Sequence, residues 1–259
     1  MERIVSMPET PDVSIDILAF SPHPDDAELG CGGSLLLARG KGFTIAIADL
    51  TEGECASRGS PEQRKEEKLL ASGVLGLTNR FSVGLPDTKI GLEPSHQDTV
   101  IELIRAVRPR IVLAPYGKDR HPDHERAGQL VRAACFYAGV ANIGKGAPYR
   151  PEEVYYYMVH SPFEPSFVVD ITPVWDKKCE AINAYRTQFS REDPDVRPTA
   201  ISNPEFLRYH EARSVYFGAM IGAAYGEPFF CRGPLAASGL PGVESGRPDK
   251  DGLFVYRSI

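Results

Sequence analysis

The chain has 259 residues, of which 42% are hydrophobic and 25% are charged, as in most soluble globular proteins. This composition excludes a disordered chain, a collagen-like fibre and a coiled coil. The formal net charge of −6 lacks the basic excess of a nucleic-acid-binding protein and disfavours docking on an anionic membrane surface.

Short apolar, β-branched segments alternate with longer helical segments along the chain. We expect strands at residues 15–20, 43–49, 80–85, 110–115, 154–160 and 167–171. We expect helices at residues 27–40, 61–75, 95–107, 123–139, 174–189 and 205–225. This alternation predicts a Rossmann-like α/β fold with a mostly parallel sheet and helices on both faces. Ligands bind beyond the carboxyl ends of the strands in such sheets. The segment 190–204, rich in Pro, Asp and Arg, is expected to be a loop that could act as a lid.

The cysteines and the N-terminal segment favour a cytoplasmic location. The five cysteines are widely spaced and include no C-x-x-C pair, which is not typical of a secreted disulfide scaffold. The first fourteen residues contain no apolar core of a signal peptide, and no run approaches the roughly 18 apolar residues of a membrane span. We therefore expect a cytoplasmic protein that binds neither nucleic acid nor membrane.

The first candidate site follows the first expected strand. Three carboxylates and an imidazole fall within residues 23–28. Both groups are zinc ligands, and a catalytic zinc site takes three protein ligands and a water. A tight turn can direct His23 and Asp26 at one ion, which leaves Asp25 free to act as a base on the water. Alternatively, Asp25 and Asp26 cap the following helix and Glu28 favours its N-terminal dipole, but capping does not explain His23.

A glycine-rich segment, Gly30–Gly33, comes next. As a phosphate-binding loop it would make the strand, loop and helix a dinucleotide site. However, its G-x-G-G spacing matches the G-x-G-x-x-G fingerprint poorly, and the preceding carboxylates would repel a pyrophosphate. A doubly wound nucleotide-binding enzyme is therefore the more remote alternative.

The second candidate site follows the strand expected to end at Pro115. His121 and His124 stand three residues apart with Asp123 between them, and they are two of only six histidines. Such a pair can supply two metal ligands, or one ligand and one acid, and an adjacent carboxylate can fix an imidazole tautomer. Because both motifs follow strands of one parallel sheet, we expect them at corresponding positions on its carboxyl edge.

Residues 21–33 (SPHPDDAELGCGG) and 121–124 (HPDH) resemble the two signature motifs of the PIG-L/LmbE-like zinc N-deacetylases. The resemblance is greatest with the bacillithiol-pathway branch, which deacetylates N-acetylglucosaminyl-malate. It continues through residues 49–53, 63–67, 79–87, 154–158, 184–189, 216–218 and 224–228. It implies a metal-dependent amidohydrolase of the LmbE-like fold, acting on a small amino-sugar conjugate. A chitooligosaccharide or a mycothiol-type precursor is the alternative substrate, and a non-catalytic sugar-binding module is a further alternative.

The resemblance also implies a role for each motif residue. Asp25 becomes the general base. His121 stabilises the oxyanion or protonates the leaving amine, with Asp123 supporting the histidines. The implied ligands of one zinc ion per subunit are His23, Asp26 and His124.

Two arginines are candidates for contact with the substrate, and one position near the site differs from the family pattern. Arg64 matches a family position that faces the substrate, and its alternative is a solvated helix charge. Arg120 is a plausible bidentate partner for a malate carboxylate. Because the net charge of −6 would not attract an anionic substrate, we expect these local arginines to do so. Phe206 stands where related enzymes carry a tyrosine, so Tyr209 or His210 is expected to replace that hydroxyl, unless His121 acts alone.

The resemblance implies one domain over residues 15–237. The segments 1–14 and 238–259 do not match, and we expect them to be an N-terminal extension and a C-terminal tail. Relatives in the bacillithiol branch form hexamers, so we expect a homohexamer by resemblance.

Overall fold

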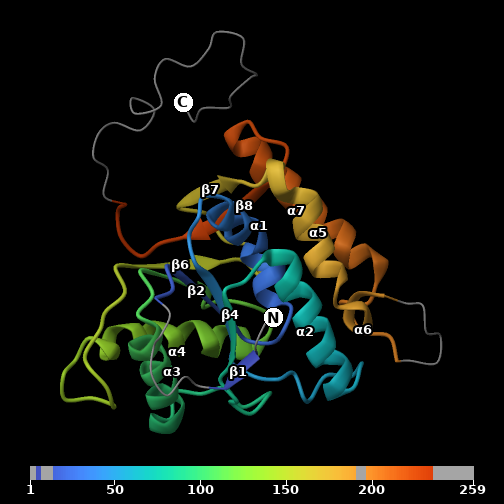
Figure 1. Cartoon of the computed structure of the whole chain (residues 1–259). Coiled ribbons are helices and arrows are strands. Elements are labelled where there is room, and N and C mark those ends of the chain that lie inside the picture. Colours follow the sequence, from blue (N-terminus) through green and yellow to red (C-terminus); the bar gives the residue numbers. More distant parts are fainter. Residues whose placement is uncertain (1–3, 7–13, 191–196, 236–259) are drawn as a thin grey trace, which may run out of the picture.

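An eight-stranded sheet forms the middle of the computed structural model, which describes residues 4–6, 14–190 and 197–235 (Figure 1). Its strand order is β1-β4-β3-β2-β5-β6-β8-β7, and neighbouring strands run parallel except where β8 pairs with β6 and β7. The predicted α/β fold with a mostly parallel sheet is confirmed. The strands are β1 (Ile4–Ser6), β2 (Ile17–Ser21), β3 (Ile45–Asp49), β4 (Asn79–Ser82), β5 (Ile111–Pro115), β6 (Glu153–Tyr157), β7 (Phe167–Asp170) and β8 (Gly226–Phe230).

Helix α2 begins and ends at residues with clear local signals. In α2, the Ser60 hydroxyl accepts from the Gln63 N–H and the Gln63 side chain accepts from the Ser60 N–H, which forms a capping box ahead of Pro61. The helix ends at Gly76, whose φ of 64° suits glycine. The helices are α1 (Asp26–Gly40), α2 (Pro61–Leu75), α3 (Pro94–Val107), α4 (Pro122–Ala138), α5 (Trp175–Asn183), α6 (Arg186–Phe189) and α7 (Pro204–Ile221), with a 3₁₀ turn at Thr172–Val174.

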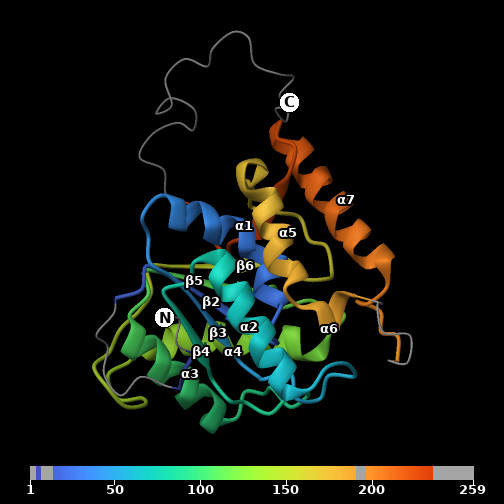
Figure 2. The ribbon, with the colours of Figure 1, turned by 45° about the vertical axis from the view of Figure 1, so that its right-hand side comes forward.

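Alternate residues of the central strands face two different helical layers. In β2, Leu18 and Phe20 pack into a buried cluster with residues of α3 and α4, whereas Ala19 packs with residues of α1 and α2. Figures 1 and 2 show α3 and α4 on one face of the sheet and α1, α2 and α5 on the other. No helix among the described residues is both long and apolar enough to cross a membrane.

Successive strands of the chain lie on opposite sides of β2. The chain adds β3 and β4 on one side of β2, and then crosses through α3 to place β5 on the other side. Such a switch point opens a crevice at the carboxyl ends of the two central strands. The loops that carry the two predicted motifs leave β2 and β5 here, so the topology itself brings them together.

Two strands and two helix boundaries differ from the sequence-based expectation. β1 lies in the segment expected to be an extension, and its three residues are too few to show alternation. β8 was missed because its sequence, GEPFF, contains glycine and proline. The helix predicted at 174–189 is divided between α5 and α6, and the helix predicted at 205–225 ends at Ile221, before Gly222 with a φ of 76°. The predicted tail 238–259 and residues 191–196 of the predicted lid loop lie outside the described residues.

The glycine-rich segment of the first motif lies inside α1, not in a phosphate-binding loop. A Cβ added at Gly30 would overlap the ring of Tyr157, and one added at Gly33 would overlap Ile171. These glycines therefore allow α1 to approach the sheet and its neighbours closely, which accounts for them without a dinucleotide.

Candidate metal centre and active site

One carboxylate oxygen joins the two predicted motifs. Asp26 Oδ2 lies 3.1 Å from His23 Nδ1 and 3.2 Å from His124 Nε2. Asp26 is the first residue of α1, and His124 lies in the first turn of α4. The three residues predicted as metal ligands are therefore in contact, with two imidazole nitrogens facing the same oxygen.

The other nitrogen of each imidazole faces a different carboxylate. His23 Nε2 lies 3.2 Å from Asp87 Oδ1 and 3.4 Å from Asp123 Oδ2, and His124 Nδ1 lies 3.2 Å from Asp119 Oδ1. Carboxylates on the outer nitrogens of ligating histidines fix the tautomer and the ring orientation. The inner atoms, two nitrogens and one oxygen, form the donor set of a catalytic zinc site, so the residues present fit the metal.

The electrostatics of this cluster favour positive charge at its centre. Burial opposes charge on His124, but Asp26 and Asp119 outweigh it and raise the pKa of His124 to about 9. Burial likewise opposes charge on His23, yet Asp123, Asp26 and Asp87 raise its pKa well above the usual value. Burial disfavours the ionised Asp26 carboxyl, but His124 and His23 lower its pKa well below the usual range. A cation between these groups would replace the protons that they otherwise hold.

Three further groupings of possible ligand atoms share these residues. Ligand atoms of Asp26, His124 and His160 lie within 4.8 Å of one another, as do those of His23, His121 and His124. The third grouping consists of His23, Asp87 and Asp123. The His160 ring stacks on His124 with centroids 5.1 Å apart. The sequence analysis missed His160, Asp87 and Asp119 as site residues. The position of His160 just beyond β6, at the same edge of the sheet, was the available signal.

Asp25 has an unusual backbone conformation and a buried side chain. Its φ is 118° and ψ is −27°, a strained combination for a residue other than glycine. Its side chain makes no helix-capping hydrogen bond, so the capping alternative does not describe it. Asp25 Oδ2 lies 3.4 Å from Arg64 Nη1, which also donates to the Pro24 carbonyl at 2.6 Å. Burial raises the pKa of Asp25 to about 8 although Arg64 opposes the shift.

His121 caps α4 with its own ring. Its Nδ1 accepts a hydrogen bond from the Asp123 N–H at 3.3 Å, which leaves the ring proton on Nε2. Burial, His124 and His23 lower the pKa of His121, so the neutral ring is favoured. The Asp123 carboxylate does not face this ring. It accepts from the Thr88 N–H at 2.8 Å and lies beside His23.

A cavity of about 260 Å³ opens over these residues, at the switch point of the sheet. Arg64 is only 5% exposed and lines the cavity, so it is not the solvated helix charge considered above. Arg120 also lines the cavity and is exposed. The lining residues from the predicted site are His23, Asp25, Asp26, Arg64, Arg120, His121 and His124.

The three residues considered for the missing tyrosine do not line this cavity within the part of the chain that the structure describes. Phe206 packs against the His160 ring with centroids 5.8 Å apart. Tyr209 is 49% exposed, and His210 is buried against Trp175. Neither is placed to take the role of the tyrosine hydroxyl at this cavity.

A buried network of ion pairs and hydrogen bonds fixes the start of α1, next to the turn that carries His23 and Asp25. Glu28 Oε1 accepts from Arg80 Nη1 at 2.7 Å and from the Tyr185 hydroxyl at 2.8 Å. Arg80 also donates twice to Asp49, at 2.7 Å each. Glu28 therefore ties the start of α1 to β4.

Sequence and structure both relate this chain to known proteins. The sequence profile of the family described as "PIG-L: GlcNAc-PI de-N-acetylase" matches residues 18–135. The conserved protein TT1542 of Thermus thermophilus is 38% identical, with a TM-score of 0.80 over 86% of this chain and 97% of that one. The diacetylchitobiose deacetylase of Thermococcus kodakarensis is 27% identical, over 82% of this chain and 80% of its own length.

Two other relatives differ in their stated reactions. The probable N-acetyl-α-D-glucosaminyl L-malate deacetylase 2 of Bacillus subtilis is 29% identical, over 66% of this chain and 82% of its own. The 4-oxalmesaconate hydratase of Pseudomonas putida is 26% identical, over 66% of this chain and 73% of its own. The profile match contains both motifs, and the match to TT1542 extends over most of both chains. On these grounds the chain belongs to the PIG-L family, as its motifs predicted.

Proposed function

We propose that this protein is a zinc-dependent amidohydrolase that removes the N-acetyl group from an N-acetylglucosamine conjugate. The observation that carries the proposal is the convergence of His23 Nδ1, Asp26 Oδ2 and His124 Nε2 in a cavity that the buried Asp25 also lines. A binding module would need neither the three-donor set nor the strained carboxylate next to it. The deacetylase names of the relatives support the same chemistry.

Each residue of the cavity has a distinct part in the proposed reaction. A zinc ion held by His23, Asp26 and His124 would supply Lewis acidity toward the amide carbonyl and activate water. Asp25 takes a proton from the attacking water, whose oxygen bonds to the carbonyl carbon. The Nε2–H of His121 donates to the oxygen that becomes negative. The C–N bond then breaks, the amine nitrogen receives the proton, and acetate and the free amino sugar leave.

We assign Arg64 and Arg120 to different tasks. Arg64 Nη1 contacts Asp25 and the Pro24 carbonyl, so it holds the base in its strained conformation. Arg120 forms no ion pair with any residue in the described ranges and borders the cavity. It is therefore the cation available to a carboxylate on the substrate, which favours N-acetylglucosaminyl-malate over an uncharged chitooligosaccharide.

The decisive experiment compares substrates on the zinc-loaded protein. Acetate release is measured with N-acetylglucosaminyl-malate, a mycothiol-type N-acetylglucosaminyl-inositol, diacetylchitobiose and N-acetylglucosamine. Hydration of 4-oxalmesaconate is followed by absorbance in parallel. We expect the highest kcat/KM with the malate conjugate. Hydration without acetate release would overturn the deacetylase proposal, and a preference for diacetylchitobiose would overturn the malate assignment alone.

An active-site variant connects the activity to the proposed base. We expect Asp25→Asn to retain its zinc, measured by elemental analysis, and to lose about 10² or more in kcat. Asp98→Asn removes an exposed acid on α3 and serves as the matched control. Loss of zinc from Asp25→Asn would mean that Asp25 and Asp26 have exchanged roles.

We propose a cytoplasmic homohexamer with one domain over residues 15–237. Helix α7 supports self-association because it exposes Val215 (45%), Tyr216 (64%) and Met220 (44%). Light scattering of the purified chain measures the assembly, and a monomer would refute the hexamer.

A further inference from the structure

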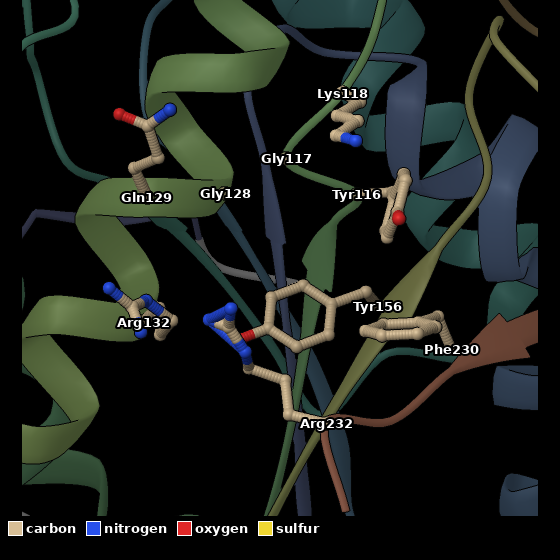
Figure 3. Close-up of a pocket in the computed structure, with 9 residues that line it drawn as sticks. All are labelled: Tyr116, Gly117, Lys118, Gly128, Gln129, Arg132, Tyr156, Phe230 and Arg232. Atoms are coloured by element: carbon tan, nitrogen blue, oxygen red, sulfur yellow. The ribbon is translucent and has the colours of Figure 1, made fainter. Parts of the chain in front are cut away.

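A second cavity, of about 480 Å³, lies between α4, β6 and the end of β8. Its lining shares no residue with the lining of the catalytic cavity. The segment that follows β5 runs between the two cavities, with Tyr116 to Lys118 facing this one and Arg120 and His121 facing the other. The lining residues are Tyr116, Gly117, Lys118, Gly128, Gln129, Arg132, Tyr156, Phe230 and Arg232 (Figure 3).

The lining carries three cations and no carboxylate. Lys118, Arg132 and Arg232 are exposed, and none of them pairs with an acid or donates a hydrogen bond elsewhere in residues 4–6, 14–190 and 197–235. On a protein with a net charge of −6, three cations that have no acidic partner within the described ranges are a local concentration of positive charge around this cavity. Such a concentration attracts an anion of matching size.

Two of these cations lie close to a buried phenol. Tyr156 is 5% exposed, and its hydroxyl points toward the Arg232 guanidinium, with Arg132 of α4 across from it (Figure 3). Guanidinium groups bind oxyanions through paired N–H donors, and the phenol adds one more donor. Lys118 contributes a third charge from the far side of the cavity (Figure 3).

The rest of the wall is aromatic. The ring of Phe230 lies 5.2 Å from that of Tyr116 and 6.2 Å from that of Tyr156, measured between centroids. These rings form an apolar wall that suits the edge or face of a flat ligand. The volume is in the range of pockets that hold small organic molecules, and is far more than one inorganic ion needs.

We propose that this cavity is a second ligand site, which binds a small flat-ringed molecule bearing a dianionic oxyanion such as a phosphate monoester. Arg132, Arg232 and the Tyr156 hydroxyl bind the oxyanion, and Tyr116 and Phe230 contact the ring. The site is independent of the proposed deacetylation, because it uses none of the catalytic residues.

Isothermal titration of the zinc-loaded protein with phenyl phosphate tests this site. Inorganic phosphate and phenol probe the two halves of the ligand, and phthalate distinguishes a dicarboxylate from a phosphate. We expect one saturable site for phenyl phosphate, with at least tenfold weaker binding of inorganic phosphate and of phenol. Tighter binding of phthalate than of phenyl phosphate would overturn the assignment of a phosphate monoester to this site.

Variants locate the binding. We expect Arg132→Gln and Arg232→Gln each to weaken binding about tenfold, the usual effect of losing one charge-assisted contact. Arg126→Gln removes an exposed arginine from the same helix outside the lining, and Arg120→Gln removes one from the catalytic cavity. Both should bind within twofold of the unmodified protein. Absence of saturable binding, or a loss caused by Arg120→Gln and not by Arg132→Gln and Arg232→Gln, would overturn the proposal. Thermal unfolding of each variant verifies that it is folded.

Discussion

Asp119 Oδ1 lies 3.2 Å from Nδ1 of His124, the ring nitrogen that points away from Asp26. The other oxygen of Asp119 accepts from the N–H groups of His160 and Ser161, at 2.9 and 3.0 Å. One carboxylate therefore links the second motif to the segment after β6 and orients a proposed metal ligand. Burial opposes ionisation of Asp119, but the adjacent His124 ring and hydrogen bonds from backbone N–H groups lower its pKa, so the carboxylate stays charged at neutral pH.

This arrangement predicts that Asp119→Asn weakens zinc binding without removing a ligand. An amide cannot hold the His124 ring as a carboxylate does, and loss of such an outer partner typically costs about 10- to 100-fold in metal affinity. Competition with a chromogenic chelator measures the zinc Kd. Asp98→Asn, on the exposed side of α3, should leave the Kd unchanged. An unchanged Kd in Asp119→Asn would show that Asp119 does not support the metal site.

Arg120→Gln is predicted to separate the candidate substrates. If Arg120 pairs with a carboxylate of the aglycone, its loss should raise KM for N-acetylglucosaminyl-malate about tenfold and leave kcat nearly unchanged, because the contact is equal in the ground and transition states. Steady-state kinetics on diacetylchitobiose, which has no carboxylate, provide the control. Equal effects on both substrates would contradict a role in recognising the anion.

His210 is predicted to make the stability of the fold depend on pH. It is buried, and its Nδ1 pairs with Arg213 at 3.0 Å, while Nε2 has no hydrogen-bond partner among the described residues. Burial, together with Lys178 and Arg213, lowers its pKa well below the usual 6.5. Below about pH 6.5, His210 therefore becomes protonated in the unfolded chain but stays neutral in the folded chain. The contribution of His210 to the free energy of unfolding is largest above that pH, and it decreases by about 1.4 kcal/mol for each pH unit below it.

The matched variant is His210→Phe, which keeps a ring against Trp175. Because this variant lacks the hydrogen bond to Arg213, we expect its free energy of unfolding at pH 8 to be about 1 kcal/mol lower than that of the unmodified protein. Between pH 7 and pH 5, its free energy of unfolding should decrease less steeply. Urea unfolding at each pH, on metal-free samples of both proteins, gives the comparison. Parallel slopes would exclude His210 as the source.

Local signals in the sequence predicted the helices, the strands and the two motifs well. They did not predict which distant residues contact these motifs. A charged stretch with proline in its first turn placed α2 at its observed bounds, and the strand–loop–helix pattern placed both motifs at the same edge of the sheet. Asp87 follows β4, which is separated from β2 by β3, so its place in the site depends on the strand order and on the path of its loop, and neither can be read from the local sequence. The local sequence also could not predict the contact between Arg64 and Asp25, because an arginine in a charged helix has the same sequence pattern whether it faces solvent or a buried carboxylate.

The glycines of α1 allow a last prediction with an internal control. A Cβ at Gly30 would overlap the Tyr157 ring, which is fully buried and held by its hydroxyl's hydrogen bond to the Phe20 carbonyl at 2.6 Å. A Cβ at Gly32 would meet its nearest neighbour, the Lys178 side chain, at an ordinary 3.7 Å. We expect Gly30→Ala to destabilise the fold by about 1–3 kcal/mol through overpacking. Gly32→Ala should stabilise it by up to about 1 kcal/mol through helix propensity. Chemical denaturation of the two variants distinguishes them. If Gly30→Ala were as stable as Gly32→Ala, α1 would not need its close approach to β6, and the glycine-rich segment would require another explanation.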